Sequence, residues 1–309
     1  MAIVGPTGSG KSRLGLYLAK EWAGHIISAD SVQVYRGLNI GTAKPTIEER
    51  RLVPHHLVDI LDPDETFSAA HFRLQASAII RDLRARGIPV FVVGGTGLYL
   101  KALCRGIFQG PSGNPDFRRS LREAAHKQGI EKLYMELKKV DPVAASRIHP
   151  RDRSRIIRAL EVYHETGRPI SSFQKNHGFA DQDFEVLKIG LSFPRNDLYR
   201  RIEARVDRML EQGWIQEVQG LLNQGLSPCA KSLQSLGYKR IVSFLQGKEN
   251  FEELALCIKT DTRRYAKRQL TWFRADPEIL WFRGDLEDID TIRMIVEKFW
   301  SESPAICRF

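Results

Sequence analysis

The segment Gly5-Pro6-Thr7-Gly8-Ser9-Gly10-Lys11-Ser12 constrains the fold most strongly, because it meets every fixed position of the GxxxxGK[ST] pattern. Glycines in such a loop let backbone N–H groups close around phosphate oxygens at the N-terminus of a helix. A short apolar stretch precedes the loop, and leucines with helical spacing follow it. The order of strand, glycine loop and helix predicts a P-loop that holds a diphosphate. In this loop we expect Lys11 to supply a point charge and Ser12 a hydroxyl ligand for Mg²⁺.

Further strands and helices alternate along the first 110 residues. Apolar runs predict strands at residues 25–28, 56–60 and 88–93, and a helix is expected at 68–86 with Ser68 as its N-cap and Gly87 closing it. Strands that alternate with helices, several of them continuously apolar, are typical of a parallel sheet covered on both faces. The sequence therefore predicts an α/β fold, with a P-loop NTPase-like parallel sheet flanked by helices.

The pattern changes after Gly110, where residues 115–166 show only amphipathic helical periodicity. We interpret residues 111–179 as an all-helical insertion domain, placed within a P-loop catalytic core domain formed by residues 1–110 and 180–309. The elements predicted for the insertion are helices at 117–127, 131–139 and 151–166. Those predicted for the second half of the core are strands at 185–191 and 279–282, helices at 196–212, 214–224, 232–246 and 251–273, and a final helix ending at Trp300.

Charge and composition limit the partners and the cellular location that we expect for the protein. The net charge of +10 favours a polyanionic partner, although a solvated basic face explains it equally well. Neither an apolar run of 18 residues nor a secretory leader is present, so we expect a cytoplasmic protein without membrane contact, and a monomer without an obligate protein partner. The four cysteines form no CxxC pair and are expected to be reduced and mostly buried: Cys104, Cys229, Cys257 and Cys307.

The ends of the predicted strands give the first indication of chemistry. An ordinary P-loop ATPase places a carboxylate beside Mg²⁺ at the end of a neighbouring strand, but the 88–93 strand continues into Gly94-Gly95-Thr96-Gly97. This argues against hydrolysis of a nucleoside triphosphate. Asp30 follows the 25–28 strand, and catalytic groups in open α/β sheets gather at such ends. Asp30 is therefore a candidate base; the alternative is a helix-capping or turn residue.

Several sequence strings, in order, resemble the bacterial tRNA dimethylallyltransferases, and the resemblance spans nearly the whole chain. They are GPTGSGKS at 5–12, Asp30-Ser31 with QVYRG at 33–37, IGTAKP at 40–45, GGTGLY at 94–99, Asp141-Pro142, RIHP at 147–150, RALEV at 158–162, Gly237-Tyr238 and RRYAKRQ at 263–269. No paired Cys and His suggest the C-terminal zinc finger of eukaryotic relatives, which favours the bacterial type.

The resemblance implies transfer of a dimethylallyl group from dimethylallyl diphosphate to N6 of the adenosine adjacent to the anticodon of tRNA, with release of diphosphate. It implies that Asp30 is the general base on N6, that Thr7, Lys11 and Ser12 contact diphosphate and Mg²⁺, and that Arg205 neutralises the leaving group. This agrees with the strand-end analysis, because a diphosphate leaving group needs no water-activating carboxylate, whereas an attacking amine needs a base.

The same resemblance implies a set of tRNA contacts, since the target adenine must leave its stack to reach Asp30. Many arginines of the insertion would supply phosphate contacts, although the alternative for each is a solvated charge. The implied tRNA-binding residues are Asp30, Ser31, Val32, Gln33, Thr96, Arg118, Ser154, Arg155, Ile156, Ile157, Arg158, Gln234, Ser235, Leu236, Gly237, Tyr238 and Lys239.

Two other functions remain open at this point. An adenylate isopentenyltransferase acting on a free nucleotide would share the P-loop and Asp30, but it has little use for a basic helical insertion. A small-molecule kinase or an NTP-binding RNA module is disfavoured by the missing carboxylate. In the basic helix at 251–273, aromatic side chains are expected in the core, so Trp272 and Phe273 are predicted to pack inward.

Overall fold

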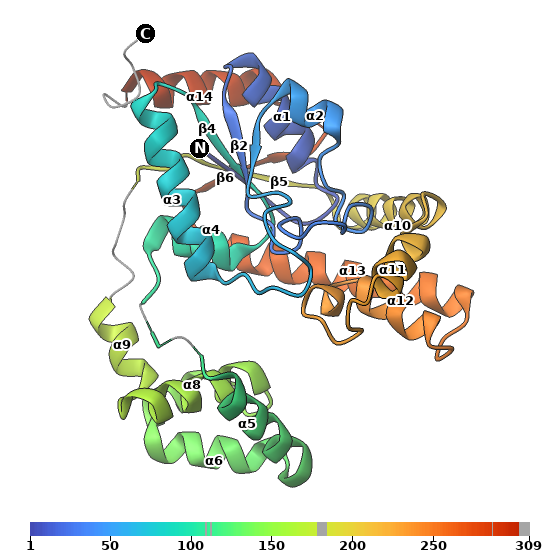
Figure 1. Cartoon of the computed structure of the whole chain (residues 1–309). Coiled ribbons are helices and arrows are strands. Elements are labelled where there is room, and N and C mark those ends of the chain that lie inside the picture. The colour runs from blue at the N-terminus through green and yellow to red at the C-terminus, as the bar shows by residue number, and fades with distance from the viewer. Residues whose placement is uncertain (109, 112, 178–183, 286, 303–309) are drawn as a thin grey trace. The chain divides into compact units, whose positions relative to one another are not determined.

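The chain divides into two compact units in the computed structural model, which describes residues 1–108, 110–111, 113–177, 184–285 and 287–302. The first unit comprises Met1–Leu103 and Phe184–Phe309, and the second is Cys104–Asp183. Figure 1 shows the elements of each unit. None of the described helices is long and apolar enough to span a bilayer.

The first unit is built on a six-stranded sheet in which every neighbouring pair is parallel, as predicted. The strand order is β3-β2-β4-β1-β5-β6. Strand β1, which leads into the P-loop, lies between β4 and β5 and pairs with both. The strands are β1 Ala2–Val4, β2 His25–Ser28, β3 His55–His56, β4 Val90–Val93, β5 Lys188–Ser192 and β6 Ile279–Arg283.

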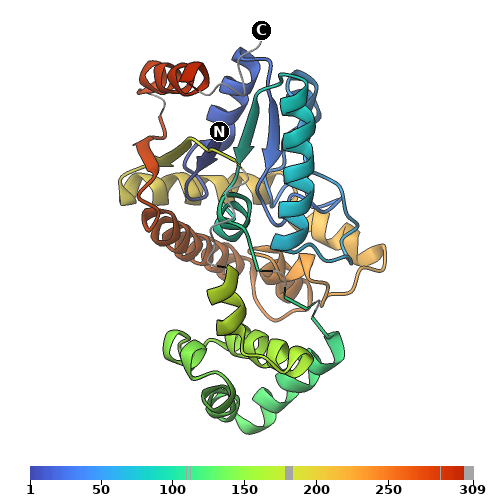
Figure 2. The ribbon, with the colours of Figure 1, turned by 90° about the vertical axis from the view of Figure 1, so that its left-hand side faces the viewer.

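Helices cover both faces of this sheet because its strands are apolar on both sides. Helices α1 (Lys11–Glu21) and α14 (Ile289–Glu302) pack in one core with Ile3 and Phe91, which are fully buried. Figure 2 shows α3 (Ala69–Ala85) on the opposite side of the sheet from α14. Ser68 caps α3 by accepting a hydrogen bond from the His71 N–H, at 3.1 Å, as the sequence predicts.

The remaining helices of the first unit lie mostly after β5. Helix α10 packs against α13 through a small cluster of Leu198, Ile202 and Ala266. Helix α13 begins with a capping box, in which Asn250 and Glu253 exchange hydrogen bonds. These remaining helices are α2 Ile47–Leu52, α4 Gly97–Arg105, which reaches the unit boundary, α10 Arg195–Glu211, α11 Trp214–Asn223, the 3₁₀ turn Ser232–Gln234, α12 Tyr238–Leu245 and α13 Phe251–Arg274.

The regular elements in the described part of the second unit are all helices, which form a core of their own. Leu137, Ile156 and Val162 are completely buried in it. Asn114 and Asp152 cap two of the helices by accepting hydrogen bonds from the first-turn N–H groups. The helices are α5 Pro115–Gln128, α6 Ile130–Val140, α7 Pro142–Arg147, α8 Arg153–Thr166 and α9 Ile170–His177.

Two predicted elements are wrong in extent. The third strand, predicted at 56–60, covers only His55–His56, because Leu57 and Asp59 adopt the left-handed backbone region, with φ of 60° and 56°. The helix predicted at 232–246 is interrupted at Gly237, whose φ is 79°, so a 3₁₀ turn precedes α12. The short helices α2, α4, α7 and α9 were not predicted.

Two predictions of burial also need correction. Phe273 is buried as expected, but Trp272 is 42% exposed, so its inward packing was predicted wrongly. Among the described cysteines only Cys104 is buried; Cys257 is partly exposed and Cys229 is exposed. All three are free thiols, and Cys307 lies outside the described residues.

Candidate active site

The P-loop lies where the connectivity of the sheet reverses. From β1 the chain moves to β2, β3 and β4 on one side, and later returns to β5 on the other side of β1. In open parallel sheets the crevice at such a switch point is where ligands bind. The carboxyl ends of β1, β4 and β2 therefore gather the P-loop, Thr96 and Asp30 at one edge of the sheet.

The P-loop has the backbone conformation that its glycines permit. Gly8 and Gly10 have φ of 81° and 92°, a region that side chains disfavour, and α1 begins directly at Lys11. The Lys11 ammonium folds over the loop and donates to the Pro6 carbonyl oxygen at 2.7 Å. Ser9 is fully buried, and its Oγ makes no hydrogen bond to the described residues. The loop thus has the conformation in which backbone N–H groups at the start of α1, together with the Lys11 ammonium, can hold a diphosphate.

Gln269, near the C-terminal end of α13, joins the P-loop to the end of β4. Its Oε1 accepts a hydrogen bond from the Thr7 N–H at 2.8 Å, and its Nε2 donates to the Gly95 carbonyl oxygen at 2.9 Å. Gln269 was not predicted as a site residue. The available signal was a glutamine at a buried position of an otherwise basic, amphipathic helix.

Asp30 forms a tight turn directly after β2. Its Oδ1 accepts hydrogen bonds from the N–H groups of Val32 at 2.8 Å and Gln33 at 3.3 Å. No hydrogen bond from the described residues reaches Oδ2, so that oxygen can accept a proton from a substrate. The Ser31 N–H donates to the Thr96 hydroxyl at 3.1 Å, which ties this turn to the end of β4. Asp30 is thus both a turn residue and a half-buried carboxylate held at the crevice.

Asp30 lies close enough to Lys11, Arg205 and Tyr265 for its charge to influence their pKa values. Burial and the neighbouring Arg205 guanidinium lower the pKa of Lys11 to about 7, while the charge of Asp30 acts in the opposite direction. Burial also lowers the pKa of Arg205, again opposed by Asp30. Burial together with the Asp30 charge raises the pKa of Tyr265 to about 12. Helices α10 and α13 therefore bring Arg205 and Tyr265 to the same site as Asp30 and Lys11.

Helix α10 contributes a second arginine that the sequence analysis did not select. The Arg201 Nε donates to the Gly8 carbonyl oxygen at 3.1 Å, and its guanidinium lies 4.4 Å from the centre of the Phe193 ring. The spacing of Arg201 and Arg205, four residues apart on one helix, places both on the same face. That spacing is the sequence signal that could have identified Arg201.

Comparison with known proteins agrees with this geometry. The family model described as IPP transferase matches residues 33–276, and a second, described as isopentenyl transferase, matches residues 1–54. The chain belongs to the IPP transferase family. The fold class and the family predicted from the sequence are confirmed.

Individual members of the IPP transferase family cover almost the whole chain. The tRNA dimethylallyltransferase 2 of Geotalea uraniireducens is 56% identical over 279 residues, or 90% of each chain. The solved tRNA isopentenylpyrophosphate transferase of Bacillus halodurans is 42% identical, with a TM-score of 0.71 and coverage of 96% of this chain and 94% of that one. A eukaryotic dimethylallyltransferase solved acting on tRNA is 30% identical, with a TM-score of 0.80 and coverage of 98% and 79%.

The metal expected for this IPP transferase is compatible with the residues present. No group of three or more His, Cys, Asp or Glu side chains that could hold a metal occurs among the described residues. Mg²⁺ usually keeps several waters and takes few protein ligands beside phosphate oxygens. The exposed Ser12 hydroxyl, in the first turn of α1, could serve as such a ligand.

The implied tRNA contacts of the first unit differ in exposure. Gln234 and Lys239 are exposed, and Ser235 and Leu236 are partly exposed. Tyr238 is buried, and its hydroxyl donates to Glu217 Oε1 at 2.7 Å. Gly237 is buried as well, so only the side chains on either side of these two residues reach the surface, and the tRNA contact of this segment stays a prediction.

In the second unit the implied contacts lie along α8. Ser154 and Arg155 are exposed, which suits contact with RNA. Ile156 and Ile157 are buried in the helical core, with exposures of 0% and 6%. Both side chains therefore pack into the core of the second unit, and their contact with RNA stays a prediction.

Two further arginines of this unit share one buried carboxylate. Glu161 Oε2 accepts hydrogen bonds from Arg118 at 2.8 Å and from Arg158 at 2.7 Å. Burial alone would raise the pKa of Glu161, but the hydrogen bonds from the two arginines outweigh it and lower the pKa. The guanidinium groups remain about one-third exposed, so they are held in place and still reach solvent.

Proposed function

We propose that this chain is a tRNA dimethylallyltransferase, a prenyltransferase that moves the dimethylallyl group of dimethylallyl diphosphate to N6 of the adenosine adjacent to the anticodon. The observation that carries the proposal is a carboxylate, Asp30, at the end of β2, whose charge acts on Lys11 of the P-loop and on Arg205, with no carboxylate at the end of β4. Such a site suits a diphosphate leaving group on one side and an attacking amine on the other.

One group of site residues would hold the diphosphate during the reaction. The P-loop amides, Lys11 and Arg205 would hold the diphosphate, and Arg205 suits the task because its planar fork can bind two oxygens. Bound Mg²⁺, held by Ser12 and diphosphate oxygens, would supply further positive charge. Thr7, whose N–H is fixed by Gln269, would present its hydroxyl to the diphosphate from within the loop.

The bond changes balance with one base. The lone pair of N6 forms a bond to C1 of the dimethylallyl group, and the C1–O bond breaks with its electron pair going to the diphosphate. The proton of N6 passes to the free oxygen of the Asp30 carboxylate. Because the substrate amine is part of a stacked base, the adenine must be extruded to reach Asp30.

The polymeric substrate is favoured over a free nucleotide by the second unit. Its exposed Ser154 and Arg155, and the paired Arg118 and Arg158, supply a basic surface that a free nucleotide does not need. The names of the relatives support the same choice.

The substrate class is tested with labelled dimethylallyl diphosphate, Mg²⁺ and either unmodified tRNA or AMP. We expect label in tRNA and not in AMP. Label in AMP alone would establish the free-nucleotide transferase instead. Label in neither, with consumption of ATP, would point to a kinase or NTP-binding module.

The base is tested by Asp30→Asn, which keeps the size of the side chain and the turn-forming oxygen. We expect turnover to fall by a factor of about 10²–10⁴, as for loss of a positioned base. Affinity for tRNA, measured by filter binding, should stay within about threefold, because the turn is kept. An equal loss of binding and turnover would make Asp30 an RNA anchor.

A further inference from the structure

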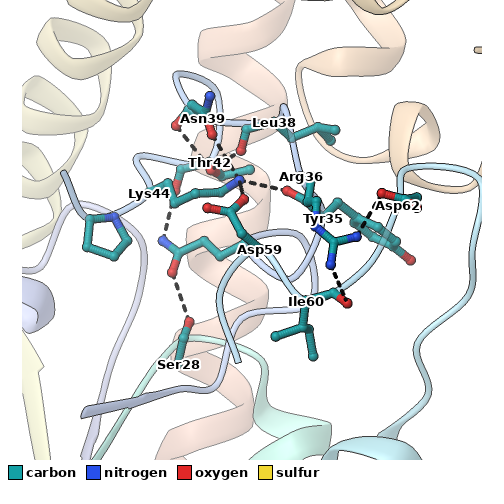
Figure 3. A network of polar contacts seen from close by, with 12 residues as sticks. Ser28, Tyr35, Arg36, Leu38, Asn39, Thr42, Lys44, Asp59, Ile60 and Asp62 are labelled. Atoms are coloured by element: carbon teal, nitrogen blue, oxygen red, sulfur yellow. Dashed lines mark hydrogen bonds and ion pairs between the residues drawn. The ribbon is translucent and has the colours of Figure 1, made fainter. Parts of the chain in front are cut away.

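A buried lysine holds the loop that follows the Asp30 turn (Figure 3). The Lys44 side chain is 2% exposed, and its ammonium donates to the Tyr35 carbonyl oxygen at 2.6 Å, to Asn39 Oδ1 at 3.0 Å and to Asp59 Oδ1 at 2.5 Å. All three donor positions of the ammonium are thereby used. Lys44 joins both ends of the segment 35–39 to the bend at residues 57–59, which contains Asp59.

This cluster connects to Asp30 through Gln33. The Asp59 N–H donates to the Gln33 carbonyl oxygen at 3.1 Å. The Gln33 side chain donates to the carbonyl oxygens of Thr42, at 3.1 Å, and Ala43, at 3.2 Å, immediately before Lys44. The backbone N–H of Gln33 in turn donates to Asp30 Oδ1. Gln33 is thus held at its carbonyl oxygen by Asp59, a partner of Lys44, and at its side chain by the two residues that precede Lys44.

The burial of the Lys44 ammonium and the backbone conformation of two nearby residues both cost free energy. Burial lowers the pKa of Lys44, although the hydrogen bond that its ammonium donates to Asp59 opposes the shift, so the charged ammonium is kept in place at the expense of its hydration. Asp59 adopts a left-handed backbone with φ of 56°, and Ala43 another with φ of 45°. Strained residues of this kind persist where the surrounding contacts enforce them and cluster near functional sites.

We infer that Lys44 is a positioning residue for prenyl transfer, which fixes the Gln33 turn and thereby aims the Asp30 carboxylate at the attacking amine. The inference rests on the proposed function. Lys44 does not itself touch the reacting atoms. It acts through the network Lys44–Asp59–Gln33–Asp30, and its loss would let the carboxylate leave its productive position while the P-loop stays intact.

The test compares three variants. Lys44→Met keeps the length of the side chain and removes the three hydrogen bonds. Arg50→Gln is the matched control, because Arg50 pairs with the other oxygen of Asp59, at 2.7 Å, and makes no hydrogen bond to Tyr35 or Asn39 in the described structure. The double variant Lys44→Met with Asp59→Asn also removes the carboxylate that pairs with Lys44 and Arg50, and asparagine tolerates the left-handed backbone.

Single-turnover transfer to tRNA and thermal unfolding are measured on each purified variant. We expect Lys44→Met to lower the transfer rate by about 10–100-fold, as small misplacements of catalytic groups do. The KM for dimethylallyl diphosphate should stay within about threefold, since the P-loop is unchanged. Arg50→Gln should transfer at close to the rate of the native chain.

The double variant separates positioning from stability. Because Asp59 keeps Arg50 as a partner after Lys44→Met, Asp59→Asn should restore at most part of the thermal stability lost in Lys44→Met, and the transfer rate should stay low, because Tyr35 and Asn39 still lack their donor. Recovery of rate together with stability would overturn the inference, as would a native rate in Lys44→Met. If the native chain itself transferred no label to tRNA, the proposed function would fail instead.

Discussion

Gln269→Ala removes a side chain that joins the P-loop to the end of β4. Gln269 as a whole is 7% exposed. Its side chain makes hydrogen bonds of 2.8 Å with the Thr7 N–H and 2.9 Å with the Gly95 carbonyl oxygen. Alanine can replace neither bond. The Thr7 N–H and the Gly95 oxygen would then lose their partner in a site where water has little access.

The magnitude follows from these two contacts. A net hydrogen bond contributes about 1 kcal/mol, and a buried polar group left without a partner costs about 1–3 kcal/mol. Since both backbone groups lie near a crevice that admits some water, we expect a loss of about 3 kcal/mol in the free energy of unfolding. For a unit of this size that corresponds to a decrease in Tm of about 6–12 °C.

Thermal unfolding of the purified variants, followed by circular dichroism, measures the effect. Lys267→Ala is the matched control, because Lys267 is exposed on the same helix, and its loss should change stability by less than about 0.5 kcal/mol. Gln269→Glu keeps the acceptor for Thr7 but loses the donor to Gly95, so its Tm should also fall. If Gln269→Ala unfolded within about 1 °C of the native chain, the bridging role would be refuted.

Two further predictions concern charge. Burial and Arg205 lower the pKa of Lys11 to about 7, so the affinity for diphosphate, measured by calorimetry, should weaken from pH 6 to pH 8 as the ammonium loses its proton. Lys11→Arg keeps its charge and should show a flatter profile; equal profiles would exclude Lys11 as the cause. Glu161→Gln leaves Arg118 and Arg158 without a counter-charge and should lower the stability of the second unit by about 2 kcal/mol, less than for a fully buried pair because both guanidiniums reach water. Limited proteolysis measures this loss, and unchanged resistance to the protease would contradict it.

The parallel sheet could be predicted because several of its strands can be recognised from their local sequence. The 25–28 strand and the core of the 88–93 strand are apolar runs, and they form β2 and β4. The end of the third strand could not be predicted, because the backbone after His56 turns left-handed at Leu57 and Asp59; Asp tolerates this conformation without requiring it, and Leu disfavours it. The broken helix near Gly237 follows from a glycine whose positive φ the sequence permits but does not require.

The site residues that follow the ends of strands could be predicted from the sequence. The P-loop, Asp30 and Thr96 each follow a strand directly, so topology alone brings them to one edge. The roles of Gln269 and Lys44 could not be predicted, because each depends on a contact that no local sequence pattern indicates. Gln269 meets Thr7 across 262 residues of sequence, and Lys44 acts through Asp59, whose place depends on an irregular loop. The contacts of Ile156 and Ile157 were assigned by sequence string alone, whereas helical periodicity buries both.

A crystal structure with diphosphate and an anticodon stem-loop tests the central claim most directly. The distance to measure joins N6 of the extruded adenosine to the nearer oxygen of the Asp30 carboxylate, with the diphosphate in the P-loop. We predict about 2.6–3.2 Å, the range of a hydrogen bond to a general base. An adenine bound elsewhere, or an Asp30 carboxylate turned away from N6 with diphosphate in place, would contradict the account.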